Sequence, residues 1–337
     1  MSHSACYPIQ TPSRFHHTGT LSRPKWLLSY RVRDNVSVEL DDVDLPCYTL
    51  PSPGISFLDG YSSAKLPSQP TQAKPSILEA LQASQQNFHH YDVISFRNTI
   101  SRLCMLNYLP DQYFCFFAIK RNSTLFLGMI DNSPPPKNEI HKKSIFIGRK
   151  VEQVLLGEDI LENPIVRIME TTLSLNKGNS KEIKILLACE TDCRSSKGEP
   201  IEIKSQQSSS KRSTYTRGEK AMKTWLQSTL GGVGKVLEIE HLNGTYVDAQ
   251  LHNLDHYKAV NFGLPSTSSF NKVLSWDSRK LFGCGAFVLH KLLDHCAPDK
   301  LYHIHVSSKF ELVIDEDFSE EGWEFVGYVD QYVSSVK

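Results

Sequence analysis

The sequence lacks a long apolar run: no stretch of about eighteen hydrophobic residues occurs, which excludes a membrane-spanning helix. It also lacks an excess of charge, since 37 Lys and Arg residues balance 37 Asp and Glu residues. A protein with a net charge of zero does not attract nucleic acid through a basic field over its whole surface. Any contact with nucleic acid must therefore be made by a local groove.

Cysteines are present but lack the regular spacing of a disulfide framework or of a common zinc site. The eight cysteines are scattered along the chain, and no signal peptide precedes them. No internal repeat is found either. These absences predict an intracellular protein of the nucleus or the cytoplasm that folds without disulfide bonds.

The sequence does contain enough apolar residues for a large core, with 337 residues and 40% hydrophobic content. The first 24 residues contain Ser, His and Pro, and we expect a disordered tail over 1–24. We expect residues 25–337 to form a single domain. The pattern of segments predicts a mixed α/β (α+β) fold with two mixed β-sheets and flanking helices.

Apolar and alternating segments predict the strands of these sheets. Segments 114–120 and 124–130 flank a short turn and predict a hairpin. A helix is expected at 281–294. Further strands are expected at 36–40, 235–240, 245–251, 303–315 and 324–328.

Two acidic strings stand close together in the middle of the chain, and they are the most informative part of it. The first carries Glu190 and Asp192, and the second carries Glu202 and Lys204. Residues two apart in a strand project from the same face, so each pair shares a face. The preceding residues Ile183 to Cys189 alternate and predict one buried face. Nine residues separate Asp192 from Glu202, which is enough for a turn that returns a second strand beside the first.

Three carboxylates and one ammonium group at the end of a hairpin suggest a metal site. Carboxylate oxygens suit Mg²⁺ or Mn²⁺, and a nearby lysine can position a water molecule or stabilise the charge of a phosphoryl group. Each string alone is more often the solvated face of a half-buried strand. The two strings in this order and at this spacing favour a metal-dependent nuclease.

Two predicted helices add polar residues to this picture. The helix over 146–157 has an apolar stripe through Val151 and Leu155, and Glu152 lies at the margin of that stripe. Glu152 alone would be read as a boundary glutamate; beside the acidic strings it becomes a third metal-site carboxylate. The helix that starts at Lys220 places Gln227 on its polar face. Gln227 can contact a phosphate or sugar, although a solvated face is the simpler interpretation.

In the order of these parts the chain resembles the DXO decapping-exonuclease family, whose core is similar to that of the PD-(D/E)xK nucleases. The resemblance extends from about Trp26 to near Trp323 and is dense in motifs only in the central third. The matching motif residues are Gly148, Lys150 and Glu152; Glu190 and Asp192; Glu202 and Lys204; and Trp225, Gln227 and Ser228.

Weaker matches lie upstream of these motifs. The segment from 95 to 104 resembles a family segment with tryptophan, arginine and glycine, in which Arg97 is retained and Phe96 and Asn98 replace the other two. Residues 55–61 resemble another family segment, which suggests Glu79 as the acidic residue of the following helix.

The resemblance implies hydrolysis at the 5′ end of single-stranded RNA with divalent metal, Mg²⁺ or Mn²⁺, as two ions. Expected activities are removal of incomplete or unusual caps such as unmethylated or NAD caps, pyrophosphate release from 5′-triphosphate RNA, and 5′–3′ exonuclease digestion. A 5′–3′ exoribonuclease is an expected partner protein. The implied catalytic residues are Glu152, Glu190, Asp192, Glu202 and Lys204.

The resemblance also assigns roles to individual residues. Glu152, Asp192, Glu202 and the backbone carbonyl of Ile203 would hold the metals. The residues implied to contact the substrate are Glu79, Phe96, Arg97, Asn98, Glu190, Lys204 and Gln227.

A second class of function stays open. A non-catalytic relative could use the same groove to hold RNA or to bind a partner protein. The replaced residues Phe96 and Asn98 keep this alternative, whereas the complete carboxylate set favours an enzyme, because carboxylates alone repel phosphate.

Overall fold

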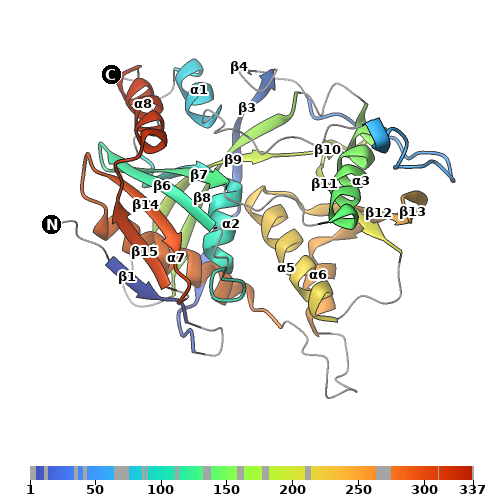
Figure 1. The fold of residues 1–337 in the computed structure, drawn as a ribbon. Coiled ribbons are helices and arrows are strands. Elements are labelled where there is room, and N and C mark those ends of the chain that lie inside the picture. Colours follow the sequence, from blue (N-terminus) through green and yellow to red (C-terminus); the bar gives the residue numbers. More distant parts are fainter. Residues whose placement is uncertain are drawn as a thin grey trace.

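The computed structural model shows two mixed β-sheets flanked by helices, as the sequence predicts (Figure 1). The structure describes residues 5–10, 14–33, 37–40, 44–63, 76–85, 88, 90–110, 114–131, 138–157, 163–176, 182–208, 214–262, 275–309 and 311–335. None of the helices in these ranges is long and apolar enough to cross a membrane.

The larger sheet has 11 strands within the described ranges, in the order β1-β15-β14-β6-β7-β5-β9-β8-β3-β4, with β2 paired to β8. Its strands are β1 (Ala5–Pro8), β2 (Gly19–Leu21), β3 (Lys25–Arg33), β4 (Ser37–Leu40), β5 (Val93–Phe96), β6 (Phe114–Arg121), β7 (Thr124–Asp131), β8 (Ile165–Leu175), β9 (Ile183–Glu190), β14 (Leu301–Val306) and β15 (Glu311–Glu316). The predicted hairpin of β6 and β7 is confirmed.

One parallel group in the centre of this sheet positions the site. β5 runs parallel to both β7 and β9, whereas the other neighbours are antiparallel. Parallel strands end at the same edge of a sheet. The start of α2 (Arg97–Met105), which follows β5 directly, therefore lies beside the end of β9.

Helices cover both faces of the larger sheet. α2, α5 (Thr214–Leu230) and α7 (Ser278–His295) pack on one face, and α1 (Ser76–Ala83) and α8 (Glu320–Ser335) pack on the other. β9 is divided between them: the alternating residues from Ile183 to Cys189 enter the first core, and Leu186 and Ala188 enter the second. The predicted buried face of β9 is confirmed, and its opposite face is buried too, as is usual for a strand covered on both sides.

The smaller sheet lies beside the larger one, together with α3 (Glu139–Leu156) (Figure 1). Its strands are β10 (Cys193–Arg194), β11 (Pro200–Gln207), β12 (Lys235–Leu242) and β13 (Thr245–Asn253). β11 and β12 are parallel and the other pairs are antiparallel, so this sheet is mixed as well. α3 packs on one face of it through Ile147, Val151 and Leu155. α6 (Leu254–Phe262) follows β13 and packs against α5.

The two acidic strings do not form one hairpin, contrary to the prediction. β9 ends at Glu190 in the larger sheet, and the returning strand β11 pairs with β10 in the smaller sheet. The chain crosses from one sheet to the other at Thr191 and Asp192. The acidic residues therefore meet at the seam between two sheets, which local sequence periodicity does not reveal.

The prediction of a disordered tail over 1–24 is wrong for two segments. Ala5–Pro8 pairs with β15, and Gly19–Leu21 pairs with β8. Gly19 fits there because an added Cβ would lie 2.6 Å from the carbonyl oxygen of Ser174 and 2.8 Å from the backbone nitrogen of Gly283. Edge pairing and close approach of this kind depend on distant segments, so a short polar sequence gives no sign of them.

The predicted strand at 324–328 is also wrong, because these residues belong to α8. Phe325, Val326, Val329 and Tyr332 are its buried residues, a spacing typical of a helix. The expected strand at 303–315 is divided into β14 and β15, which pair as a hairpin. The predicted helix at 281–294 is confirmed within α7.

Candidate active site

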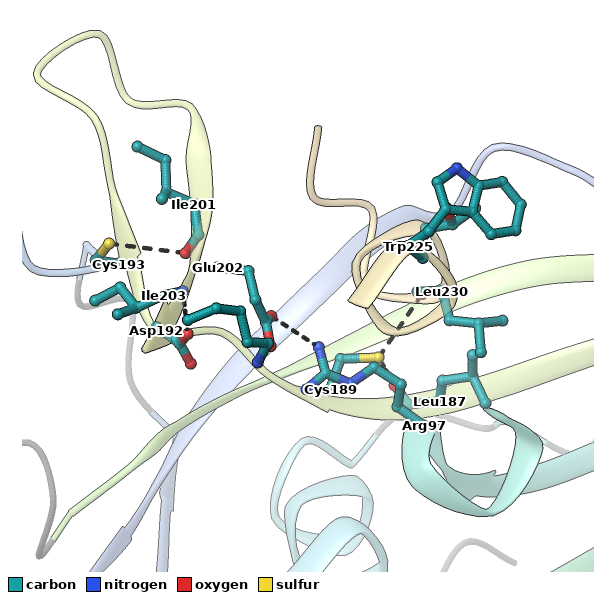
Figure 2. A network of polar contacts seen from close by, with 12 residues as sticks. Arg97, Leu187, Cys189, Asp192, Cys193, Ile201, Glu202, Ile203, Trp225 and Leu230 are labelled. Carbon is teal, nitrogen blue, oxygen red and sulfur yellow. Dashed lines mark hydrogen bonds and ion pairs between the residues drawn. The ribbon is translucent and has the colours of Figure 1, made fainter. Parts of the chain in front are cut away.

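Glu202 is the centre of a polar cluster at the seam between the sheets. Its side chain is only 3% exposed, and each of its oxygens accepts a hydrogen bond from a cation. Lys204 Nζ donates to Oε1 at 2.6 Å. Arg97 Nη1 donates to Oε2 at 3.2 Å (Figure 2). Burial raises the pKa of this carboxyl group, but the two cations outweigh burial and hold the pKa below its ordinary value.

Asp192 lies on the other side of Lys204, where the chain enters the smaller sheet. Its Oδ2 atom accepts a hydrogen bond of 2.6 Å from the backbone nitrogen of Ile203 (Figure 2). Burial and the charge of Glu202 raise the pKa of Asp192 well above its ordinary value. This hydrogen bond holds the carboxylate of Asp192 against the backbone of β11, the strand that also carries Glu202.

Glu152 and Glu190 approach from α3 and from the end of β9. They line a cavity of about 290 Å³ together with Asp192. Burial, followed by the charge of Glu190, raises the pKa of Glu152 to about 7. Burial also raises the pKa of Glu190, although its side chain is accessible from the cavity. Carboxylates with raised pKa values are those whose negative charge is poorly compensated, so this cavity favours a cation.

The same cavity contains two residues that the sequence did not point out. Arg149 lines it and lowers the pKa values of Glu152 and Glu190, although burial outweighs this effect. Arg149 stands three residues before Glu152 on α3, and helical spacing could have identified it. Thr191 also lines the cavity, and its hydroxyl group is buried, with no hydrogen-bond partner within the described part of the chain. No pattern in the sequence marks Thr191.

The two cations of the cluster are held charged by the carboxylates. Burial lowers the pKa of Lys204, but Glu202 and Asp192 outweigh it and raise the pKa above its ordinary value. Burial also lowers the pKa of Arg97, but nearby carboxylates, Glu202 above all, outweigh burial and raise the pKa above its ordinary value. The predicted contact of Arg97 with RNA stays a prediction; in this structure its guanidinium group binds Glu202 and is 13% exposed.

A second cavity of about 570 Å³ lies between α2 and α5, and two predicted substrate residues line it. Asn98 and Gln227 face this cavity and not the carboxylates. Lys223 lines it too and forms an ion pair of 2.6 Å with Glu219. Arg97, at the start of α2, lies between the two cavities, because it reaches back to Glu202.

Two further predicted substrate residues, Phe96 and Glu79, lie outside both cavities. Phe96 is the last residue of β5 and packs against the core under α1 and α8. Glu79 is on α1, which packs against α8 and β4. Glu79 affects the pKa values of Tyr30 and Tyr328 by its charge. Neither residue lines the two cavities described above.

The donor atoms of the cluster fit a divalent cation in their chemistry. Glu152, Asp192 and Glu202 offer carboxylate oxygens, which magnesium and manganese prefer. The cavity of about 290 Å³ that Glu152 and Asp192 line leaves room for a further ligand. Within the described residues, however, no group of three His, Cys, Asp or Glu side chains stands ready to bind one ion. Each oxygen of Glu202 accepts one hydrogen bond, from Lys204 or from Arg97, and each keeps a further lone pair with which it could bind a metal.

Buried carboxylates and a lysine at the seam of two mixed sheets define the class of the PD-(D/E)XK nucleases. A model of the RAI1-like PD-(D/E)XK nuclease family matches residues 22–319. This match covers most of the chain, and the protein belongs to that family.

Individual relatives agree with this assignment. The decapping nuclease dom-3 of Caenorhabditis elegans is 25% identical over 169 residues, a match that covers 44% of this chain and 42% of the length of that relative. Three solved structures share the fold. Rai1 of Scheffersomyces stipitis has a TM-score of 0.77 at 17% identity and covers 99% of this chain and 97% of its own.

The other two structures are complexes. Rai1 of Candida albicans, in complex with pU5-Mn²⁺, has a TM-score of 0.76 at 17% identity, and the match covers 99% of this chain and 100% of that one. Dxo1 of K. lactis, in complex with manganese, has a TM-score of 0.66 at 14% identity, with 94% and 98% covered. At these identities the likeness concerns the fold.

Proposed function

We propose that this protein is a divalent-metal-dependent hydrolase that acts on the 5′ end of single-stranded RNA. The proposed reactions are removal of incomplete caps, such as unmethylated or NAD caps, release of pyrophosphate from 5′-triphosphate RNA, and 5′–3′ exonuclease digestion. One observation carries the proposal: Glu152, Glu190, Asp192, Glu202 and Lys204 come together from three separate elements at one seam.

Charge explains why this arrangement suits phosphate chemistry. A groove that only held RNA would gain nothing from several partly uncompensated carboxylates, because they repel phosphate. With cations bound, the same carboxylates become favourable. Glu152, Asp192, Glu202 and the carbonyl oxygen of Ile203 are the atoms that would hold the ions. The bound ions would activate a water molecule and stabilise the leaving oxygen of an in-line displacement.

The other residues of the cluster have separate roles in this proposal. The ammonium group of Lys204 would orient the water molecule or offset the charge of the scissile phosphate. Arg97 positions Glu202, since it binds the oxygen that Lys204 does not. Glu190 lines the cavity wall, where it would face the substrate.

Two relatives support the choice of metal and substrate. The Candida albicans Rai1 structure is a complex with pU5-Mn²⁺, and a Scheffersomyces stipitis Rai1 structure is a complex with (3′-NADP)⁺ and calcium ion. Both pair a divalent cation with a phosphate-containing molecule. The proposal transfers this pairing to the carboxylate cluster of the present chain.

A second candidate function is the binding of RNA without hydrolysis. It is favoured by the pairing of Glu202 with both Lys204 and Arg97, which leaves no set of three ready metal ligands within the described residues. In that case Glu202 would be a structural residue that neutralises two buried cations.

One set of incubations separates the two functions. Purified protein is mixed with 5′-triphosphate, unmethylated-cap, NAD-capped and 5′-monophosphate RNAs, each with Mn²⁺ or with EDTA. We expect products in Mn²⁺ only, and none from Glu202→Ala. The control is Glu199→Ala, which removes an exposed carboxylate that directly precedes β11 and pairs with Lys235. Intact RNA in every tube, with binding still detected, would establish the second function instead.

A further inference from the structure

An exposed tryptophan lies on β3, outside both cavities. Trp26 is 52% exposed, and the guanidinium carbon of Arg167 lies 4.9 Å from the centre of its ring. A cation over one face of an indole ring holds the ring in place and leaves its opposite face to solvent. An aromatic face presented in this way can stack with a planar ring of a ligand.

The positive charge of Arg167 is only partly compensated by neighbouring groups. Its Nε atom is buried and has no hydrogen-bond partner in the ranges that the structure describes. Burial lowers the pKa of Arg167, and the charge of Asp44 opposes this effect only in part. Asp44 also forms an ion pair of 3.3 Å with Arg194, so one carboxylate is shared between two cations. The pair of Trp26 and Arg167 therefore offers an aromatic face and a positive charge that an anion can use.

The position of this pair relative to the carboxylates follows from the sheet. Arg167 on β8 is paired with Cys189, the residue before Glu190 on β9. Trp26 on β3 is paired with Met169. Trp26 thus lies two strands across from β9 and about three residues back, with its Cα atom roughly 14 Å from that of Glu190 by ordinary strand spacings, and on the face of the sheet that carries Cys189.

A glycine-rich turn lies beside the same surface. A Cβ added at Gly232 would lie 2.9 Å from the side chain of Met169, so the turn contacts the strand that pairs with Trp26. A Cβ added at Gly234 would meet nothing within 4 Å, so the turn also leaves open space. The turn therefore adds little side-chain bulk beside the strand that pairs with Trp26.

We propose that Trp26 and Arg167 form a stacking platform for a nucleobase of the RNA strand, downstream of the nucleotide that is cut, with Arg167 also pairing with a phosphate. This inference rests on the proposed function, since it takes RNA as the ligand. It adds a contact that depends on the length of the strand. A short oligomer fills the cluster but does not reach the platform.

The test measures the binding of two 5′-monophosphorylated oligouridylates, of two and of ten nucleotides, with Ca²⁺ in place of Mn²⁺ and under conditions where both oligomers are verified to remain intact. We expect Trp26→Ala to weaken binding of the longer oligomer about tenfold, the size of one lost stacking contact. Binding of the dinucleotide should stay the same within a factor of about two, as expected for a residue outside its reach. Trp26→Phe should retain most of the affinity, because an aromatic face remains.

A matched control is available on the other side of the molecule. Trp323 on α8 is also 52% exposed, and Trp323→Ala should bind both oligomers as the wild type does. Arg167→Gln should lower the salt dependence of binding of the longer oligomer by about one phosphate contact.

Three outcomes would overturn the inference. Equal affinities of Trp26→Ala and Trp323→Ala for the longer oligomer would show that no base stacks there. An equal loss for both oligomers would show a general effect of the substitution on the fold. A wild-type protein that binds neither oligomer and cuts no RNA would refute the proposed function as well, whereas normal cutting with an unaffected Trp26→Ala refutes the platform alone.

Discussion

The two cavities at the site differ in the charge of the residues that line them. The first, lined by Glu152, Glu190 and Asp192, collects negative charge from three elements. The second, between α2 and α5, collects amide groups and cations, and its one carboxylate, Glu219, is paired with Lys223. Burial raises the pKa values of the three carboxylates of the first cavity, and the positive charges near them do not offset this effect.

This difference suggests separate roles for the two cavities in the proposed reaction. Under the proposed function, we expect cations in the first cavity and the phosphates and bases of the RNA in the second. The ion pair of Arg97 and Glu202 connects the start of α2, where Asn98 lines the second cavity, with β11 of the carboxylate cluster. The comparison predicts that substitutions in the first cavity affect the chemical step and substitutions in the second affect binding.

The largest effect is expected from removal of a carboxylate at the seam. Glu202→Ala and Asp192→Ala should each lower the rate of hydrolysis about 10³-fold or more, since loss of one member of a catalytic unit disables the whole unit. Glu219→Ala in the second cavity is the control and should keep most of the rate. Turnover at the wild-type level in either seam variant would contradict the assignment of these carboxylates to metal binding.

The next largest effect is expected for Lys204. Lys204→Gln should bind RNA nearly as well as the wild type but lose about 10²-fold to 10³-fold in the chemical step, because its charge matters most when negative charge shifts in the transition state. Single-turnover kinetics at saturating RNA measures this step directly. An unchanged rate constant there, with a higher KM, would move Lys204 from the chemistry to substrate binding.

A smaller effect is expected in the second cavity. Gln227→Ala and Lys223→Ala should raise KM about two- to tenfold, the size of a lost hydrogen bond, and leave kcat unchanged. Lys223→Ala should also weaken the salt dependence of binding, whereas the uncharged Gln227 should not affect it. A fall in kcat with constant KM for either variant would contradict the assignment of the second cavity to substrate binding.

The smallest effect concerns stability. In EDTA at pH 8, Glu152→Gln should raise the melting temperature by about 1–3 °C, because it removes one of several repelling buried charges. Glu219→Gln should not raise it, since the carboxylate of Glu219 is stabilised by Lys223. The comparison is made by thermal denaturation of both variants and the wild type. An equal rise in melting temperature for Glu219→Gln and Glu152→Gln would show that charge repulsion in the first cavity does not specifically lower the stability of the protein.

The residue types at the site were predictable from the sequence, and so was much of the secondary structure. The spacing of Glu190, Asp192, Glu202 and Lys204 identified four members of the cluster, and the apolar stripe of α3 identified Glu152. Strong periodicity is a local property, which is why the hairpin of β6 and β7 and the helix α7 were predicted correctly. Segment 324–328 was misread because five residues are too few to separate a buried strand from a helix.

The sequence by itself determined which groups carry charge and where strands and helices of strong periodicity lie. Only the tertiary structure decided that the acidic strings belong to two sheets, that Asn98 and Gln227 share a cavity apart from the carboxylates, and that Ala5–Pro8 and Gly19–Leu21 are strands. It also decided that Arg97 binds Glu202. The physical reason is the same in each case: pairing, burial and charge compensation depend on residues far apart in the chain, and their free energies arise only when the two sheets have come together.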